Sequence, residues 1–163
     1  MGSIRVANGG GSMKALSLWQ PWASLWACGR KSYETRDWST GYRGPLLIHA
    51  AKTICTDISE ELGYICEEEF GQRWPFDLPA GAMIGVCELV SCTPTQNMHV
   101  DAEERAQGNF TSGRYAWGIQ NSRVFDRPIP FRGRQQLFDV PDDVIAGARH
   151  LPAAEPSPQA KLL

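Results

Sequence analysis

Residues 13–52 read MKALSLWQPWASLWACGRKSYETRDWSTGYRGPLLIHAAK, and no other stretch of the chain is as informative. It begins with a tryptophan-rich segment, continues with the charged element K-x-x-E-x-R-x-W at 31–38, and ends with the apolar run P-L-L-I-H-A-A and a lysine. Aromatic rings beside Arg and Lys are the side chains with which proteins hold a base and its neighbouring phosphate. The stretch therefore indicates a binding site for a nucleotide or a nucleic acid.

Hydrophobic patterning predicts five or six short strands and few helices. A strand is expected at 14–18, and Pro21 followed by apolar residues and then Gly29 predicts a short helix at 21–28. The near-continuous apolar run at 45–51 is typical of a strand buried on both faces. Further strands are expected at 33–36, 82–92, 115–125 and 128–131, and further helices from Thr56 or Asp57 to Phe70, within 96–107, and after Pro141.

This order of elements contains no regular βαβ repeat, and no G-x-G-x-x-G follows a predicted strand. A nucleotide-binding Rossmann sheet is therefore not expected. Many short strands with few helices predict an α+β fold, a small and partly open β-barrel with two to four helices packed on its outside.

The net charge of -2 hides a strong asymmetry along the chain. Residues 14–52 carry a net charge of +4, residues 53–113 carry -9, and residues 114–163 carry +2. A basic face built from the first and last thirds is one interpretation, with the acidic segment turned elsewhere. The alternative is that both sets of charges are ordinary solvated surface.

Cysteine and histidine spacing argues against a metal centre. The five cysteines form no C-x-x-C pair and the three histidines are scattered, so we expect neither a zinc site, nor a disulfide framework, nor any other cofactor. No apolar run approaches the length of about 20 residues that a membrane span needs. These features predict a protein of the reducing cytoplasm.

The chain length of 163 residues fits one domain. Residues 1–12 are rich in Gly and Ser and are expected to be a disordered leader or tag before Met13. The Pro- and Ala-rich residues 151–163 are expected to be a disordered tail, which leaves 13–150 as the folded domain.

Three motifs in order, L-S-L-W-Q-P-W-A-S-L, G-R-K-x-x-E-T-R-x-W and Y-R-G-P-L-L-I-H-A-A-K, resemble the ASCH domain (activating signal cointegrator homology) of the PUA-like superfamily. The resemblance spans roughly residues 14 to 140 and implies a small β-barrel with a cleft beside the first helix. It also implies a ligand that is RNA, DNA or a modified base. Members of the family are proposed nucleic-acid-binding modules, some bacterial members resemble ribonucleases, and others with a K-x-x-T element are amidohydrolases of acylated cytidine.

The K-x-x-E element departs from the hydrolase pattern. Lys31 falls on the lysine of K-x-x-T, but Glu34 takes the place of the threonine. Thr35 is one residue away, which in a strand means the opposite face. From the residues alone, Glu34 and Arg36 share one face of an extended segment, and Lys31 can lean towards them. The two cations would neutralise a phosphate, or all three groups form a structural ion-pair cluster.

Aromatic and charged side chains define the candidate site. Trp19 and Trp38 flank polar motifs and are candidates for stacking on a base, whereas Trp22, Trp26 and Trp117 are assigned to the core. The residues expected to bind nucleic acid are Trp19, Gln20, Lys31, Glu34, Arg36, Trp38, Arg43, Lys52, Arg114 and Tyr115. If the protein is an enzyme, the expected catalytic residues are Lys31, Glu34, Lys52 and Tyr42.

The sequence thus predicts a single-domain protein whose cationic, aromatic-lined cleft binds single-stranded RNA or DNA, or a modified nucleotide. One alternative is a metal-independent hydrolase, either a ribonuclease or an amidohydrolase on N-acylated cytidine. For this alternative, Lys31→Ala or Lys52→Ala is expected to abolish turnover and to leave stability nearly unchanged. A third alternative is a module that docks onto another protein through its acidic helix.

Overall fold

The computed structural model describes residues 2–3 and 10–152. Most of the expected leader 1–12 and of the expected tail 151–163 lies outside these residues, so that division of the chain stays a prediction. Within the described part, strand β2 already begins at Ser12.

The strands are β1 (Gly2–Ser3), β2 (Ser12–Gln20), β3 (Tyr33–Arg36), β4 (Gly44–Ile54), β5 (Ala82–Pro94), β6 (Tyr115–Pro130), β7 (Phe138–Pro141) and β8 (Arg149–His150). The helices are α1 (Trp22–Ala27), α2 (Glu60–Phe70), α3 (Ala102–Ala106) and α4 (Asp142–Ile145), with a 3-10 turn η1 (Thr95–Asn97). One sheet runs in the order β1-β8-β6-β5-β4-β2-β7, and β3 pairs with β6 beside this path.

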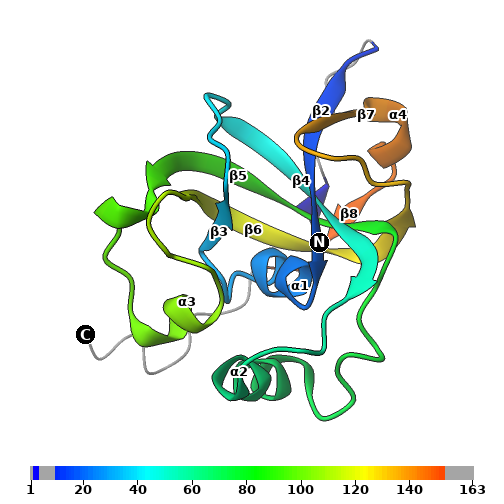
Figure 1. Cartoon of the computed structure of the whole chain (residues 1–163). Helices are drawn as coiled ribbons and strands as arrows, with labels where there is room; N and C mark the ends of the chain where they lie inside the picture. Colours follow the sequence, from blue (N-terminus) through cyan, green and yellow to red (C-terminus); the bar gives the residue numbers. More distant parts are fainter. Residues whose placement is uncertain (1, 4–9, 153–163) are drawn as a thin grey trace.

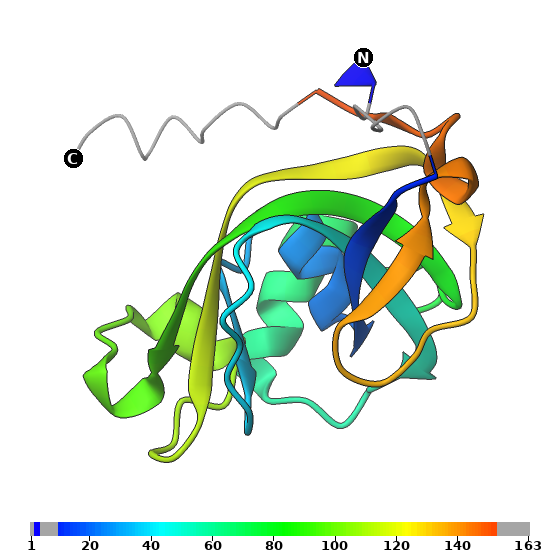
Figure 2. The same ribbon diagram turned by 90° about the horizontal axis from the view of Figure 1, so that it is seen from above.

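The sheet curls into a partly open barrel, as the view from above shows (Figure 2). All its pairs are antiparallel except β2 with β4, which are parallel and are joined through α1 and β3. The predicted α+β class, a small and partly open barrel with a few helices, is confirmed. Helix α1 adds a feature to this picture, because it lies within the curve of the sheet (Figures 1 and 2).

Strand β4 is buried on both faces because its side chains alternate between two apolar clusters. Leu46 and Ile48 pack in the cluster that surrounds Trp26 of α1, whereas Leu47 packs in a second cluster with Phe138 of β7. The apolar run of β4 therefore follows from its central place in the sheet, as expected.

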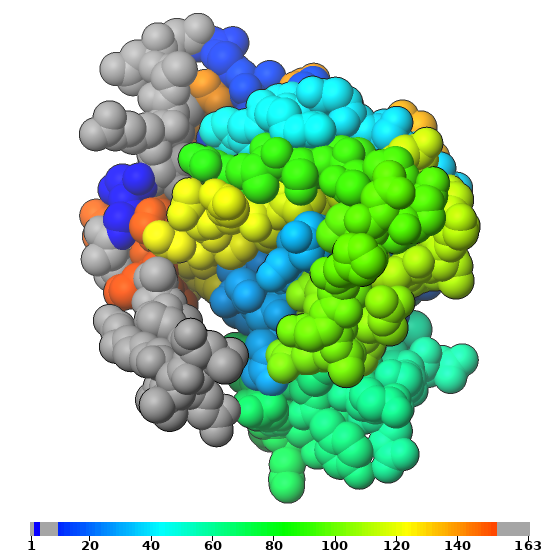
Figure 3. Space-filling model, turned by 90° about the vertical axis from the view of Figure 1, so that its left-hand side faces the viewer, coloured from blue at the N-terminus to red at the C-terminus, as the bar shows by residue number. Residues whose placement is uncertain are grey.

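Helix α2 forms a lobe beneath the barrel (Figures 1 and 3). Its N-cap is Ser59, whose hydroxyl accepts a hydrogen bond from the N–H of Leu62, so the expected start at Thr56 or Asp57 is wrong by two or three residues. Arg30 fastens the lobe, with ion pairs to Glu68 and Glu69 of α2 and to Glu103 of α3.

Two strand expectations need correction. The two expected strands at 115–125 and 128–131 are one long strand, β6, whose pairing with β5 shifts register at several points. Strand β7 was not expected, although it pairs with β2 and closes one edge of the barrel. Among the described residues, none of the helices has the length and apolar character required to cross a membrane.

Candidate functional site

The turn into α1 is built by a buried glutamine. Gln20 is fully buried, its Oε1 accepts a hydrogen bond from the N–H of Ser24 at 3.0 Å, and its Nε2 donates to the carbonyl of Pro79 at 2.8 Å. Because neighbouring side chains of a strand point to opposite sides, Trp19 faces solvent, with 56% of its surface exposed. Gln20 therefore lies in the core, whereas Trp19 lies at the rim of a cavity.

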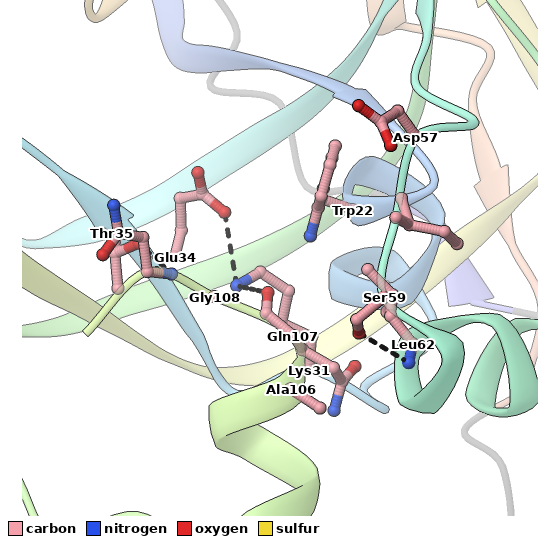
Figure 4. Close-up of a pocket in the computed structure, with 12 residues that line it drawn as sticks. Trp22, Lys31, Glu34, Thr35, Asp57, Ser59, Leu62, Ala106, Gln107 and Gly108 are labelled. Carbon is pink, nitrogen blue, oxygen red and sulfur yellow. Dashed lines mark hydrogen bonds and ion pairs between the residues drawn. The ribbon is translucent and has the colours of Figure 1, made fainter. Parts of the chain in front are cut away.

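The three charged groups of the K-x-x-E-x-R element come together (Figure 4 shows Lys31 and Glu34). Glu34 lies between the two cations, with Oε2 3.4 Å from Lys31 Nζ and Oε1 3.2 Å from Arg36 Nε. Lys31 is 1% exposed, and its ammonium also donates to the carbonyls of Tyr33 and, at 2.9 Å, of Gln107. Lys31 therefore has no free hydrogen-bonding direction of its own and holds the α3 segment against β3.

Glu104 holds the backbone that carries this cluster. Its carboxylate accepts the N–H of Tyr33 at 2.8 Å and the N–H of Ser32 at 3.0 Å. Burial raises the pKa of Glu104, and these two hydrogen bonds counteract only part of that effect. The residue fixes the backbone that carries the charged element.

Within the described part of the chain, four hollows lie around the charged element and strand β2. The inner hollow, about 380 Å³, is lined by Trp22, Lys31, Glu34 and Thr35, by the start of α2 with the residues just before it, and by the end of α3 with the residues just after it (Figure 4). The middle hollow, about 460 Å³, lies between Trp19 and Arg114.

The outer hollow, about 380 Å³, is lined by Ser17, Trp19, Arg36, Trp38, Arg134, Gln135 and Gln136. The basic hollow, about 1000 Å³, is lined by Lys52, Arg132 and Arg134 around His49 and Ser17.

These hollows are neighbours, because each shares lining residues with the next, and together we call them the groove. Glu34 and Thr35 line both the inner and the middle hollow, Trp19 and Arg36 line both the middle and the outer hollow, and Arg134 lines both the outer and the basic hollow. The groove therefore passes from a polar, partly acidic end, over aromatic rings, to a cationic end.

The structure brings most of the expected binding residues to this groove. Its lining includes Trp19, Lys31, Glu34, Arg36, Trp38, Lys52 and Arg114. Arg114 reaches the groove while its Nη2 donates to the carbonyl of Thr35 at 3.0 Å. Their assignment to ligand binding stays a prediction.

Four expected residues do not line these hollows. Gln20 is used inside the α1 turn, as described above, and Tyr115 packs against the core. Arg43 folds back onto the carbonyls of its own loop, at Thr40 and Tyr42. Tyr42 donates its hydroxyl to the carbonyl of Pro45 at 2.5 Å, and burial raises the pKa of that phenol. Sequence proximity to the motif had suggested these residues, but local hydrogen bonding or packing turns them away.

The tryptophans divide differently from the expectation. Trp26 and Trp117 are fully buried in the core, but Trp22 is only partly buried and lines both the inner and the middle hollow. Trp38 lies edge-on to Trp117, with ring centroids 4.6 Å apart. The buried ring of Trp117 therefore fixes the position of Trp38. Trp22 was assigned to the core because its neighbours are apolar, and it does pack against two of the apolar clusters, but it stays partly exposed beside the hollows.

Sequence reasoning missed the cationic end of the groove. Arg132 and Arg134 lie in the segment between β6 and β7, 80 and 82 positions after Lys52, which lines the same hollow. The F-R-G-R-Q-Q run is a visible signal, but only the barrel topology brings it beside β4. Among residues 2–3 and 10–152, no cluster of three His, Cys, Asp or Glu side chains is arranged to hold a metal ion.

Fold and groove together define a class of protein, the small α+β barrels that carry a groove beside their first helix. The family model of the ASCH domain matches residues 16–129, and the chain belongs to this family. It is 26% identical over 137 residues to activating signal cointegrator 1 from Mus musculus and to the same protein from Homo sapiens. The match covers 82% of this chain but 23% of either relative, so the chain spans about a quarter of their length.

The fold also has a counterpart among solved structures. A crystal structure of ASCH from Zymomonas mobilis superposes with a TM-score of 0.53 at 14% identity, and covers 84% of this chain and 96% of the other. At this level of identity the likeness establishes the shared fold alone.

Proposed function

We propose that the groove binds a single-stranded nucleic acid, RNA or DNA, or a single nucleotide with a modified base. The observation that carries this proposal is the outer hollow, where two indole rings (Trp19 and Trp38) and two guanidinium groups (Arg36 and Arg134) surround one space. Indoles stack on bases of any sequence, and guanidinium groups pair with phosphate through planar, bidentate hydrogen bonds.

Trp19 supports a single-stranded ligand. Trp19 is 56% exposed and lines the outer hollow together with Trp38, so its ring is free to stack on a flat partner. A base has such a flat face only when it is unstacked, as in single strands, loops or free nucleotides.

The cationic end of the groove supports the binding of the phosphate groups of a nucleic acid. Lys52, Arg132 and Arg134 are exposed, and among the described residues none of them forms an ion pair. Cations that no carboxylate neutralises contribute most to the attraction of a polyanion. Several glutamates of the acidic third are, in contrast, paired with Arg30 away from this end.

Hydrolysis through Lys31 has less support, because the ammonium of Lys31 is fixed by two carbonyls and Glu34. For the compartment we propose the cytoplasm, since all five thiols are free, as a reducing environment would keep them.

Binding is tested by fluorescence anisotropy with labelled single-stranded RNA, single-stranded DNA and duplexes. The affinity for single strands should exceed that for duplexes, and it should fall between about 50 and 200 mM salt because counterions are released from the phosphates. An anisotropy that stays constant with every probe, including free nucleotides, refutes the proposal.

Matched variants locate the site. Trp19→Ala should weaken binding by about 1–3 kcal/mol, the usual value for one stacked base. Phe76→Ala is the control, because Phe76 is even more exposed, at 85%, and does not line the groove. Arg134→Ala should reduce the salt slope by about one, whereas Arg127→Ala, another exposed arginine, should leave it unchanged.

A further inference from the structure

Ser17 and His49 lie against each other where the outer and basic hollows meet. Ser17 Oγ lies 2.8 Å from His49 Nδ1, and His49 Nε2 lies 2.8 Å from the carbonyl oxygen of Phe131. Because a carbonyl oxygen only accepts, Nε2 of the neutral ring carries the proton and Nδ1 offers its lone pair to the serine hydroxyl. A serine that donates to a histidine oriented by a third group has the geometry of an activated nucleophile.

The surroundings keep this histidine neutral. Burial lowers the pKa of His49 below its ordinary value of 6.5. The charged groups that line the basic hollow with it are Lys52, Arg132 and Arg134, all of them cations, and they oppose a further positive charge. At neutral pH, Nδ1 is therefore available to accept a proton.

The serine is accessible, which a purely structural pair would not require. Ser17 is partly exposed and lines the middle, outer and basic hollows, whereas His49 behind it is 2% exposed. The basic hollow, which Ser17 and His49 both line, contains cations that have no ion-pair partner among the described residues. Nucleophile, base and anion-binding groups thus meet in one cavity of about 1000 Å³.

We propose that Ser17 is the nucleophile and His49 the general base of a site that cleaves carboxylic esters bearing an anionic group. Ser17 Oγ attacks the carbonyl carbon and forms the Oγ–C bond while its proton passes to His49 Nδ1. The ester C–O bond then breaks, and the leaving alcohol takes this proton. Water next attacks the acyl carbon and gives a proton to His49. The Oγ–C bond then breaks, the carboxylic acid leaves, and the proton on His49 returns to Ser17 Oγ. Lys52, Arg132 and Arg134 hold the anionic group.

A fluorophosphonate probe tests the nucleophile directly and needs no nucleic acid, so the result is independent of the function proposed above. In the labelling step the P–F bond breaks, the Oγ–P bond forms, fluoride leaves, and the serine proton passes through His49 to solvent. Peptide mass spectrometry of the full chain should find the adduct on Ser17. Ser12→Ala, which removes an exposed serine of the same strand, should label like the wild type, and Ser17→Ala should lose the label.

Two further measurements separate an activated serine from a structural one. His49→Gln should slow labelling by about 100-fold, the usual contribution of a general base. In the wild type, where no substitution can disturb folding, the labelling rate should be constant above about pH 7 and fall in acid as His49 gains a proton. Absence of an adduct at Ser17, or a rate no greater than that at Ser12, overturns the proposal.

The substrate class is tested with two p-nitrophenyl esters that differ in one group, the neutral acetate and the anionic hemisuccinate. Faster release of nitrophenol from the anionic ester supports the assignment of Lys52, Arg132 and Arg134. The joint variant Lys52→Ala, Arg134→Ala should lose that preference. Equal rates for both esters in the wild type, or no release from either, overturn the proposed substrate class.

Discussion

Arg36 donates a hydrogen bond from Nη2 to the carbonyl oxygen of Ser17 across 3.0 Å, and so joins β3 to β2. Its Nε lies 3.2 Å from Glu34 Oε1, close enough for an ion pair although not aligned for a hydrogen bond. Ser17 in turn contacts His49, whose ring reaches the carbonyl of Phe131. A chain of polar contacts thus crosses the groove floor and fixes its walls relative to one another.

Arg36→Ala should lower the free energy of unfolding by about 1–3 kcal/mol, because it leaves the carbonyl of Ser17 and the carboxylate of Glu34 short of a partner. The Glu34 side chain is 14% exposed, so water replaces the lost partner only in part. Urea denaturation followed by intrinsic fluorescence measures the change.

Arg127→Ala is the matched control, since Arg127 is exposed and forms no ion pair within the described part of the chain. A loss from Arg36→Ala no larger than the loss from Arg127→Ala would contradict the role of Arg36 as a bridge between strands.

Lys31→Met should destabilise the protein by about 3–5 kcal/mol, the usual cost of breaking one buried ion pair. This corrects the expectation from the sequence that a change at Lys31 leaves stability nearly unchanged, because the ammonium is 1% exposed and bound to Glu34 and to backbone carbonyls. Thermal and urea unfolding measure the loss.

Adding Glu34→Gln to Lys31→Met should restore part of that stability, because the unpaired carboxylate is then neutral. Glu88→Gln, a change at an exposed glutamate, should give no such recovery in the same background. Purely additive effects of the two changes at 31 and 34 would show that the pair is not coupled.

The sequence predicted the fold class because the period of its apolar residues reports burial directly, as in the run at 45–51 that became the doubly buried β4. It also predicted that Lys31, Glu34 and Arg36 gather, because their spacing along one short segment leaves few other arrangements. Spacing along the sequence therefore predicted contacts correctly where the contacting residues are close in the sequence.

The remaining features depend on distant contacts that no local pattern encodes. Gln20 was expected in the site, but its amide is bound to Ser24 in its own turn and to the distant carbonyl of Pro79. Arg43 was also expected there, but it is bound to a carbonyl of its own loop. Arg134 and the pairing of Ser17 with His49 depend on how the chain after β6 returns to β2 and β4, which only the barrel topology sets.

His49 should make stability depend on pH. Because its pKa is lower in the folded protein than the ordinary 6.5 expected for the unfolded chain, the unfolded chain binds more protons in this range. The contribution of His49 is therefore fully present above about pH 6.5 and is lost as the pH falls towards the folded pKa. Urea unfolding of the wild type and of His49→Gln, measured across this range, should show the difference shrinking in acid.

His99→Gln is the control for this measurement, since His99 is exposed. It replaces a histidine outside the Ser17–His49 pair, so it measures what a histidine substitution does by itself. If the difference between wild type and His49→Gln did not vary with pH, His49 would titrate in the folded protein as it does in the unfolded chain.

Gly133→Ala should destabilise the protein, because a Cβ at this position would lie 2.5 Å from His49 Cε1 and 3.0 Å from Ser17 Oγ. Neither neighbour can move freely, since each is held by hydrogen bonds. We therefore expect the free energy of unfolding to fall by about 1–3 kcal/mol, as for an overpacked core.

Gly63→Ala is the opposite control, because a Cβ there meets nothing within 4 Å and the residue lies within α2. This substitution should stabilise the protein by about 0.5–1 kcal/mol, since alanine loses less conformational entropy than glycine in a helix. Denaturation midpoints that move in the same direction for both variants would show that the segment at 133 does not pack on the Ser17–His49 pair.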